Sequence, residues 1–192
     1  MGISEDLASV FDEIGSEFEN VSSGETERLD IESTDKVGIF SVTLRSNSVF
    51  SQGSLLKEVT TGKHYLLYSS VPEQFENSVV VLASKAFLCA NTAIVQSLSS
   101  VKDPVTRKEV STFTNEVVTP CYAVSSNTGN GLNSEFDNVL FTESVLRIVL
   151  KTSYAVSVLT RILVDGVKYQ VSSVDLVRFP GLMFLELIED VR

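Results

Sequence analysis

Histidine and cysteine, which many catalytic and metal sites use, are scarce in this sequence. His64 is the only histidine, which excludes a metal site built from several histidines and makes a histidine-based triad depend on one residue. It follows a turn and precedes an apolar run, so we interpret it as a partly exposed structural histidine. Cys89 and Cys121 lack the close spacing of a metal-binding pair and stand among apolar neighbours. We interpret both as small buried core residues.

Two further stretches contain residues that ligand sites use, but their spacing matches no known motif. Gly62-Lys63 lacks the upstream glycine and the following Ser or Thr of a phosphate-binding loop. Glu135, Asp137 and Glu143 do not have the spacing of a calcium loop, so we interpret them as part of a solvated acidic loop. We therefore expect no catalytic residue, no cofactor and no metal, and we interpret the protein as a non-enzyme.

Composition indicates a globular protein with an acidic surface. The chain has 192 residues, of which 43% are apolar and 8% aromatic, with no Trp and a formal net charge of −10. This charge disfavours a sequence-independent grip on duplex DNA and binding to an anionic membrane, because both depend on Lys and Arg. The acidic start MGISEDL predicts no secretion signal, and the apolar runs are too short for a transmembrane helix. Synthesis in the reducing cytosol is expected.

The N-terminal segment has the pattern of an amphipathic helix. Large apolar residues recur at helical spacing, with acidic residues on the opposite face. The stripe consists of Leu7, Val10, Phe11, Ile14 and Phe18. Two interpretations are open: the stripe covers one opening of the chain's own β domain, or it docks on a neighbouring subunit.

After this helix the pattern is that of β structure. Residues 19–36 are polar and acidic, which predicts an exposed connection containing at most a short strand. Residues 38–45 alternate as a half-buried strand. Residues 55–59 and 64–68 flank the turn sequence T-T-G-K, which predicts a hairpin that ends at Val71-Pro72-Glu73.

The middle of the chain is less regular. Residues 79–98 fit either strands or one helix face, and their Val and Ile content favours strands. A charged turn is predicted around Asp103-Pro104. Residues 127–133, NTGNGLN, are too rich in Gly and Asn for regular structure and are predicted to form a loop. Further strands are predicted at residues 119–125, 139–150 and 154–159.

The C-terminal residues 159–190 carry the clearest β signal. Asp165-Gly166 between two β-rich runs predicts a hairpin with a type I′ turn. The alternation of apolar and polar residues then shifts by one position, which predicts a bulge near Ser172-Ser173. After a Phe-Pro-Gly turn, residues 182–188 are apolar at both odd and even positions, as in a strand buried on both faces. Three consecutive antiparallel strands are therefore expected to close the chain.

These elements predict a mainly β protein: a small antiparallel β-barrel or sandwich with an N-terminal amphipathic helix. We expect residues 1–24 to form the helix and a linker, and residues 25–192 to form the β domain. That domain would contain nine or ten strands and end in the three-stranded module at residues 159–190.

Two stretches resemble structural proteins of tailed phages. Residues 160–175, TRILVDGVKYQVSSVD, resemble their closing module, in which an Arg-containing strand precedes a D-G-x-x-Y-x-V hairpin. Residues 61–67, TGKHYLL, resemble their G-K-x-Y-L hairpin. Leu88-Cys89-Ala90-Asn91, followed by Asp103, is similar to their R-C-N…D strand and turn, with the Arg absent and Ala90 inserted. The group implied is that of head–tail connectors, namely adaptor, head-closure or neck proteins.

The resemblance implies a virion protein, made in the host cytoplasm, that assembles as a homo-oligomeric ring. Its expected neighbours are the portal or adaptor on one side and tail proteins on the other, with no membrane. DNA would pass through the lumen without sequence-specific binding. The residues expected at subunit interfaces are Leu7, Phe11, Ile14 and Phe18 of the helix and Asn127, Gly129, Asn130 and Gly131 of the loop.

Two alternatives belong to other classes. One is a different tail or baseplate β-structural component that binds carbohydrate, which predicts exposed aromatic side chains clustered in a groove. The other, the least favoured, is a small enzyme with a site around His64 and nearby acids.

Overall fold

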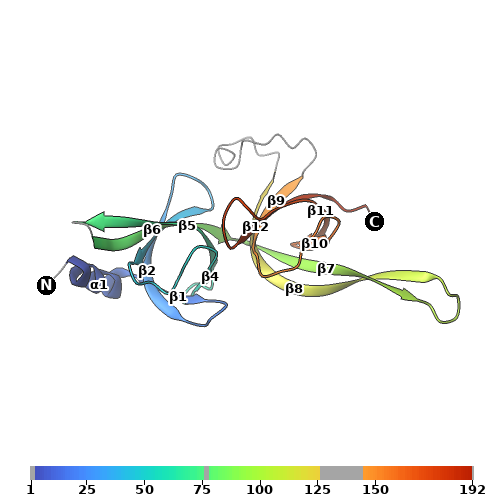
Figure 1. Cartoon of the computed structure of the whole chain (residues 1–192), viewed down its shortest axis with the longest axis horizontal. Coiled ribbons are helices and arrows are strands. Elements are labelled where there is room, and N and C mark those ends of the chain that lie inside the picture. Colours follow the sequence, from blue (N-terminus) through green and yellow to red (C-terminus); the bar gives the residue numbers. More distant parts are fainter. Residues whose placement is uncertain (1–2, 76–77, 126–144, 192) are drawn as a thin grey trace.

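The protein consists of two β-barrels placed one after the other along its long axis (Figure 1). The computed structural model describes residues 3–75, 78–125 and 145–191. Within these residues there is one helix, α1 (Ile3–Ile14), and twelve strands, arranged as two closed antiparallel sheets of six strands each. The predicted mainly β class with an N-terminal helix is therefore confirmed, and its sheets close as barrels.

The first barrel is formed by the first six strands. Their order around the barrel is β1-β2-β3-β6-β5-β4, and β4 pairs with β1 to close it. Its interior is filled by alternate side chains of these strands, among them the fully buried Phe18, Leu29, Leu44 and Leu67. The strands are β1 (Ser16–Asn20), β2 (Thr26–Ser33), β3 (Ile39–Arg45), β4 (Leu55–Glu58), β5 (His64–Phe75) and β6 (Ser78–Cys89).

The second barrel begins directly after the first. Only Ala90 separates β6 from β7, so the chain passes between barrels without a linker. Ile148, Leu150, Ile162 and Val171 lie in the core of this barrel. Its strands are β7 (Asn91–Lys102), β8 (Glu109–Ser125), β9 (Leu146–Lys151), β10 (Arg161–Val164), β11 (Val167–Asp175) and β12 (Leu182–Glu189).

The two barrels share one topology. The second barrel has the order β7-β8-β9-β12-β11-β10, which repeats the first when β7 is matched to β1 and β12 to β6. The match extends to a detail of β5 and β11. Each strand carries a bulge, after Leu67 in β5 and after Val171 in β11, and both of these residues are fully buried. The chain is therefore a tandem structural repeat.

An aromatic cluster joins the barrels. The ring of Phe87 is stacked between Tyr68, at 4.1 Å, and Tyr122, at 4.7 Å, so residues of β5, β6 and β8 form one stack. Beside it the backbones touch, because a Cβ added to Gly53 would lie 2.8 Å from the Cα of Gly181. Both glycines have positive φ, which an L side chain disfavours. The barrels are thus in direct van der Waals contact through large apolar side chains and bare backbone.

The contact uses a different outer surface on each barrel. We call the first the β4–β5–β6 wall, which contributes Leu66 and Phe87, and the second the β8–β9–β12 wall, which contributes Tyr122, Val149 and Phe184. Leu66 and Phe87 point away from the interior of the first barrel yet are fully buried, because the second barrel covers them.

The closing module agrees with the sequence-based prediction. Asp165 and Gly166 both have positive φ and join β10 to β11 with Val164 opposite Val167, as a type I′ turn requires. The register shifts between Val171 and Ser173, where the bulge was predicted. The carboxylate of Asp165 accepts hydrogen bonds from the Thr92 amide and the Asn91 side chain, which lower its pKa. These bonds attach the turn to the start of β7.

The N-terminal region differs from the prediction in two respects. The helix ends at Ile14, so the expectation that it includes Phe18 is wrong. At Gly15 the chain turns so tightly that a Cβ would lie 2.5 Å from the carbonyl oxygen of Phe11. Phe18 lies in β1, inside the first barrel, which therefore starts before residue 25. Residues 19–36, predicted as an exposed connection, contribute to the β1–β2 hairpin with Gly24 in its turn.

Two strand boundaries also differ. β5 was expected to end at Val71-Pro72-Glu73, but it continues to Phe75 with Pro72 opposite Leu82 of β6. Beyond Leu66, β5 no longer pairs with β4, so the proline removes no ladder bond on that edge. Residues 154–159, predicted as a strand, form no strand; they are irregular up to a turn at Val158-Leu159, and Leu159 has a positive φ. The strands favoured for residues 79–98 are confirmed as β6 and β7.

Candidate subunit interface

Of the residues considered for chemistry, His64, Cys89 and Cys121 lie in strands, whereas Glu135, Asp137 and Glu143 lie outside the described residues. His64 starts β5, is half-buried, and pairs with Lys57 of β4 on one side and Cys89 of β6 on the other. Burial, and next the positive charge of Lys57, lower its pKa. Among the described residues no group of three or more His, Cys, Asp or Glu side chains is placed to hold a metal ion.

Both cysteines are buried, which confirms their interpretation as core residues. Cys121 lies inside the second barrel, and burial is the main cause that raises its pKa to about 12. Cys89 lies in the aromatic cluster between the barrels, and burial raises its thiol pKa still further. Neither thiol is ionised at neutral pH, so neither is a nucleophile in the folded protein.

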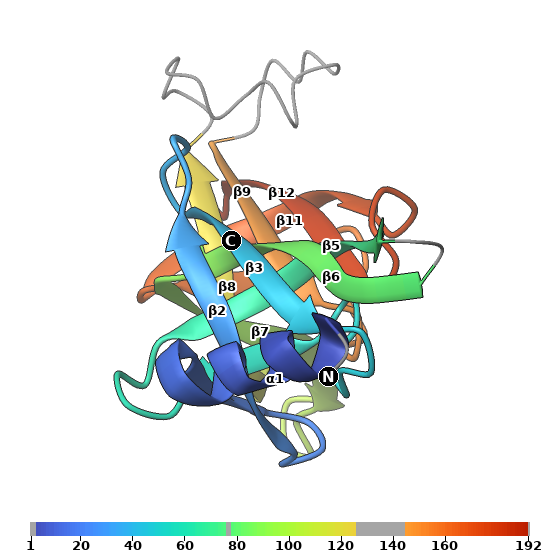
Figure 2. The ribbon, with the colours of Figure 1, turned by 90° about the vertical axis from the view of Figure 1, so that its left-hand side faces the viewer.

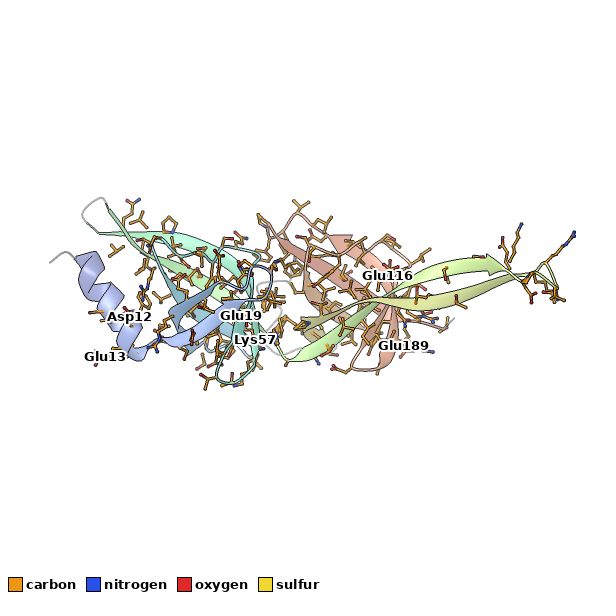
Figure 3. The ribbon with its side chains drawn as sticks, turned by 90° about the horizontal axis from the view of Figure 1, so that it is seen from below. Asp12, Glu13, Glu19, Lys57, Glu116 and Glu189 are labelled. Carbon is orange, nitrogen blue, oxygen red and sulfur yellow. The ribbon has the colours of Figure 1, made fainter. Side chains whose placement is uncertain are left out.

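The most prominent surface feature is the β7–β8 hairpin. Up to Gln96, β7 also pairs with β10, and from Tyr122 onward β8 also pairs with β9. Between these points, among the described residues, the two strands pair only with each other. We call residues 97–114 the arm. It extends beyond the second barrel along the long axis of the molecule (Figures 1 and 3).

The base of the arm is fixed to the second barrel. The guanidinium of Arg161 lies 3.5 Å from the ring centroid of Phe113, in the geometry of a cation–π contact. Arg161 also forms a buried ion pair with Asp190, whose side chain is fully enclosed. The direction of the arm is therefore set where it leaves the barrel.

Along its strands the arm has one hydroxyl-bearing face and one mixed face. On the first, Ser97 and Thr114 are hydrogen-bonded at 3.1 Å, and Ser99 and Thr112 at 3.0 Å. On the second, Leu98 is 55% exposed opposite Phe113. The arm thus presents apolar and polar side chains to solvent on a ribbon only two strands wide.

The turn at the tip of the arm directs basic side chains outward. The Asp103 carboxylate accepts hydrogen bonds from the amides of Val105 and Thr106, and these bonds lower its pKa. Val105 is 88% exposed. Three basic side chains surround it, all exposed, at Lys102, Arg107 and Lys108. The tip also holds Asp103 and the exposed Glu109, so it carries a small excess of basic side chains around Val105 in a chain that is acidic as a whole.

The opposite end of the molecule carries α1, which lies across the outer end of the first barrel (Figure 2). Phe11 is 5% exposed and lies against the Arg45 guanidinium, while Arg45 also pairs with Asp12. Val10 and Ile14, one helical turn apart, are 44% and 67% exposed. The apolar stripe of the helix is thus divided: Phe11 faces the chain's own barrel, and Val10 and Ile14 face solvent.

The interface residues predicted from the sequence have different outcomes. Ile14 lies on the surface, Phe11 is buried against its own chain, and Phe18 is enclosed in the barrel. Leu7 is part of α1, but its side chain is not described. The loop residues Asn127, Gly129, Asn130 and Gly131 lie outside the described residues. The arm was missed, because its tip was interpreted only as a charged turn.

The aromatic side chains give no support to a carbohydrate groove. No Phe or Tyr whose burial is described is exposed, since those of both barrels line the cores or the contact between them. The described part of the chain contains no helix long and apolar enough to cross a bilayer. No protein-family model, curated protein or solved structure matches the chain at a significant level.

Proposed function

We propose that this protein is a structural subunit of a tailed-phage virion that forms a homo-oligomeric ring at the head–tail joint. In this role it links the portal or capsid side to the tail and lines the channel through which DNA passes. The observation that carries the proposal is the arm, which leaves the second barrel as a two-stranded ribbon.

An isolated two-stranded ribbon is marginally stable in water, because each strand has a partner on one side only. Its outer edges also expose backbone donors and acceptors that can pair with another chain. A neighbouring subunit that covers the ribbon both stabilises its strands and pairs with or shields their exposed edges. A ring supplies such a neighbour to every copy through one repeated contact.

Two properties of the chain agree with a DNA channel and a connector. A net charge of −10 suits a channel wall that DNA passes without adhering to it. The two hairpins that resemble phage connector proteins occupy equivalent positions in the two barrels, at the β4–β5 turn and the β10–β11 turn. Each barrel therefore carries one of the two hairpins to which the resemblance refers.

The proposal is tested by peptide mass spectrometry on purified particles whose heads and tails are separated beforehand. Recovery of several copies per particle at the head–tail junction supports the connector role. Recovery only with the distal tail would instead assign the chain to the tail or baseplate. Absence from particles overturns the virion role altogether.

A further inference from the structure

We propose that the arm of one copy docks on the α1 end of the next copy, so that subunits associate head to tail. This inference rests on the proposed ring and names the surfaces that form its contact. One surface is the arm tip around Val105, and the other is the outer face of α1 with Val10 and Ile14.

The first argument comes from the tandem repeat. Inside the chain, the β4–β5–β6 wall of the first barrel packs against the β8–β9–β12 wall of the second. The contact joins two different faces, so it is heterologous. Because the barrels are repeats, each barrel also has the face that its neighbour uses in this contact, and that second face is not used inside the chain. The remaining faces are the β10–β11–β12 wall of the second barrel and the β2–β3–β6 wall of the first.

Both remaining faces differ from the internal contact in ways that suit a contact between separate molecules. In the second barrel, the positions equivalent to the buried Leu66 and Phe87 are Gln170 and Ile188, which are half-buried. On the first barrel, α1 packs against β2, where the Arg28 side chain donates a hydrogen bond to the Asp12 carbonyl. The helix thus covers the place that a preceding barrel would occupy, and any neighbour must meet its outer face.

The second argument is the placement of the arm. The arm and α1 lie at opposite ends of the long axis in two perpendicular views, with Asp12 and Glu13 at the helix end (Figures 1 and 3). A copy placed next in the row therefore has its α1 end toward the arm. Because the arm projects past its own barrel, it overlaps that copy.

The third argument is complementarity of charge and apolar surface. α1 contains four acidic residues, Glu5, Asp6, Asp12 and Glu13, and no basic one, and Asp12 is paired with Arg45 of its own chain. The arm tip carries three exposed basic side chains near an exposed valine and two acidic ones, of which Asp103 accepts hydrogen bonds from its own turn. Opposite charges around two small apolar centres favour this pairing over arm-to-arm or helix-to-helix contact, both of which bring like charges together.

Cysteine crosslinking of the full-length chain tests the contact directly. Val105→Cys and Ile14→Cys place one thiol on each surface, and the native thiols are buried with raised pKa values. With a short bismaleimide, a mixture of the two single variants should give crosslinked dimers, and the double variant a ladder of oligomers. Val37→Cys, similarly exposed but in the β2–β3 turn, is the control that should not crosslink with Val105→Cys.

Charge reversal provides an independent test. Arg107→Glu with Lys108→Glu should weaken self-association by about tenfold or more, because several exposed ion pairs become repulsive. Glu13→Lys in the same chain should restore part of it, whereas Lys63→Glu, on the β4–β5 turn, should have no effect. Since all four positions are exposed, folding is retained and circular dichroism verifies it.

The outcomes separate this inference from the proposed function. Oligomers that form without a crosslink between the thiols introduced at positions 105 and 14 would overturn the inference while leaving the ring proposal standing. A chain that stays monomeric at every concentration would contradict both. Crosslinking of Val105→Cys to itself alone would replace the head-to-tail contact with a symmetric one and so overturn it.

Discussion

Removing the ring of Phe87 is expected to separate the unfolding of the two barrels. Phe87 is fully buried, stacks on Tyr68 and Tyr122, and meets Phe184 edge-on at 6.4 Å. Burial and stacking of this kind make a Phe→Ala substitution cost about 3–5 kcal/mol. Because the ring lies between the barrels, most of the lost free energy is the energy that holds the two barrels together. Unfolding of Phe87→Ala should therefore divide into two transitions, whereas the wild type should unfold in one.

Urea denaturation followed by far-UV circular dichroism and tyrosine fluorescence is the appropriate assay. The chain has no Trp and five Tyr, and Tyr68 and Tyr122 contribute the part of the tyrosine signal that comes from the stack. Phe18→Ala is the matched control, because Phe18 is equally buried but lies inside the first barrel against Tyr65. It should destabilise that barrel by a similar amount without exposing the stack.

A single transition for Phe87→Ala with a loss below about 1 kcal/mol would refute this reasoning, since it would mean that the stack contributes little to joining the barrels. Identical unfolding profiles for the Phe87 and Phe18 variants would refute it equally.

Three further changes test other contacts. Gly53→Ala should destabilise the protein by about 1–3 kcal/mol in urea denaturation, because its Cβ meets the Gly181 backbone at a residue with positive φ. Arg161→Met should cost about 3–5 kcal/mol, because it removes the guanidinium that forms an ion pair with the buried carboxylate of Asp190. Asp165 has a lowered pKa, so its contribution to stability is complete above its ordinary pKa near 3.9 and is lost as the pH falls toward the lowered value. Asp165→Asn should therefore flatten the decline of stability below about pH 4, as measured by thermal unfolding across pH.

Each of these predictions has a clear contrary result. Wild-type stability of the Gly53 variant would mean that the barrels do not approach as closely as described. An Arg161→Met protein that keeps its stability would show that the buried pair and the arm base are not coupled to the fold. If the stability of Asp165→Asn declined below pH 4 as steeply as that of the wild type, the hydrogen bonds to the Asp165 carboxylate would not contribute to the stability of the fold.

Local signals predicted the hairpins because their causes are local. Asp165-Gly166 specifies a type I′ turn by backbone conformation alone, and the shift of apolar phase after Val171 marks the bulge. The extent of the N-terminal helix was less well predicted, because Phe18 continues the helical spacing by coincidence. Its actual position depends on the tight turn at Gly15, which is set by contacts with β2.

The division into two barrels could not be recognised from composition, because a single residue, Ala90, connects them. One signal for the repeat was nevertheless present. Gly62, Tyr65 and Leu67 each lie 104 positions before Gly166, Tyr169 and Val171. This G-x-x-Y-x-Φ pattern, in which Φ is apolar, marks the same turn and strand of both barrels.

The arm was missed for a physical reason as well. Its Ser- and Thr-rich strands have no apolar periodicity, so nothing local indicates that they extend past the barrel. What reveals the arm is the absence of third-strand pairing between Gln96 and Tyr122 in the described part of the sheet, and that is a property of the whole barrel.

The most direct test of the ring is sedimentation velocity, with electron microscopy of the same sample, on the intact chain and an arm-shortened variant. In the variant, Asn-Gly replaces residues 99–112 and joins Leu98 to Phe113, which are opposite each other, so the contact with Arg161 is kept. We expect the intact protein to form closed rings as its concentration rises, and the variant to remain a folded monomer. Monomeric intact protein at every concentration, or rings of the same size from both chains, would contradict the account.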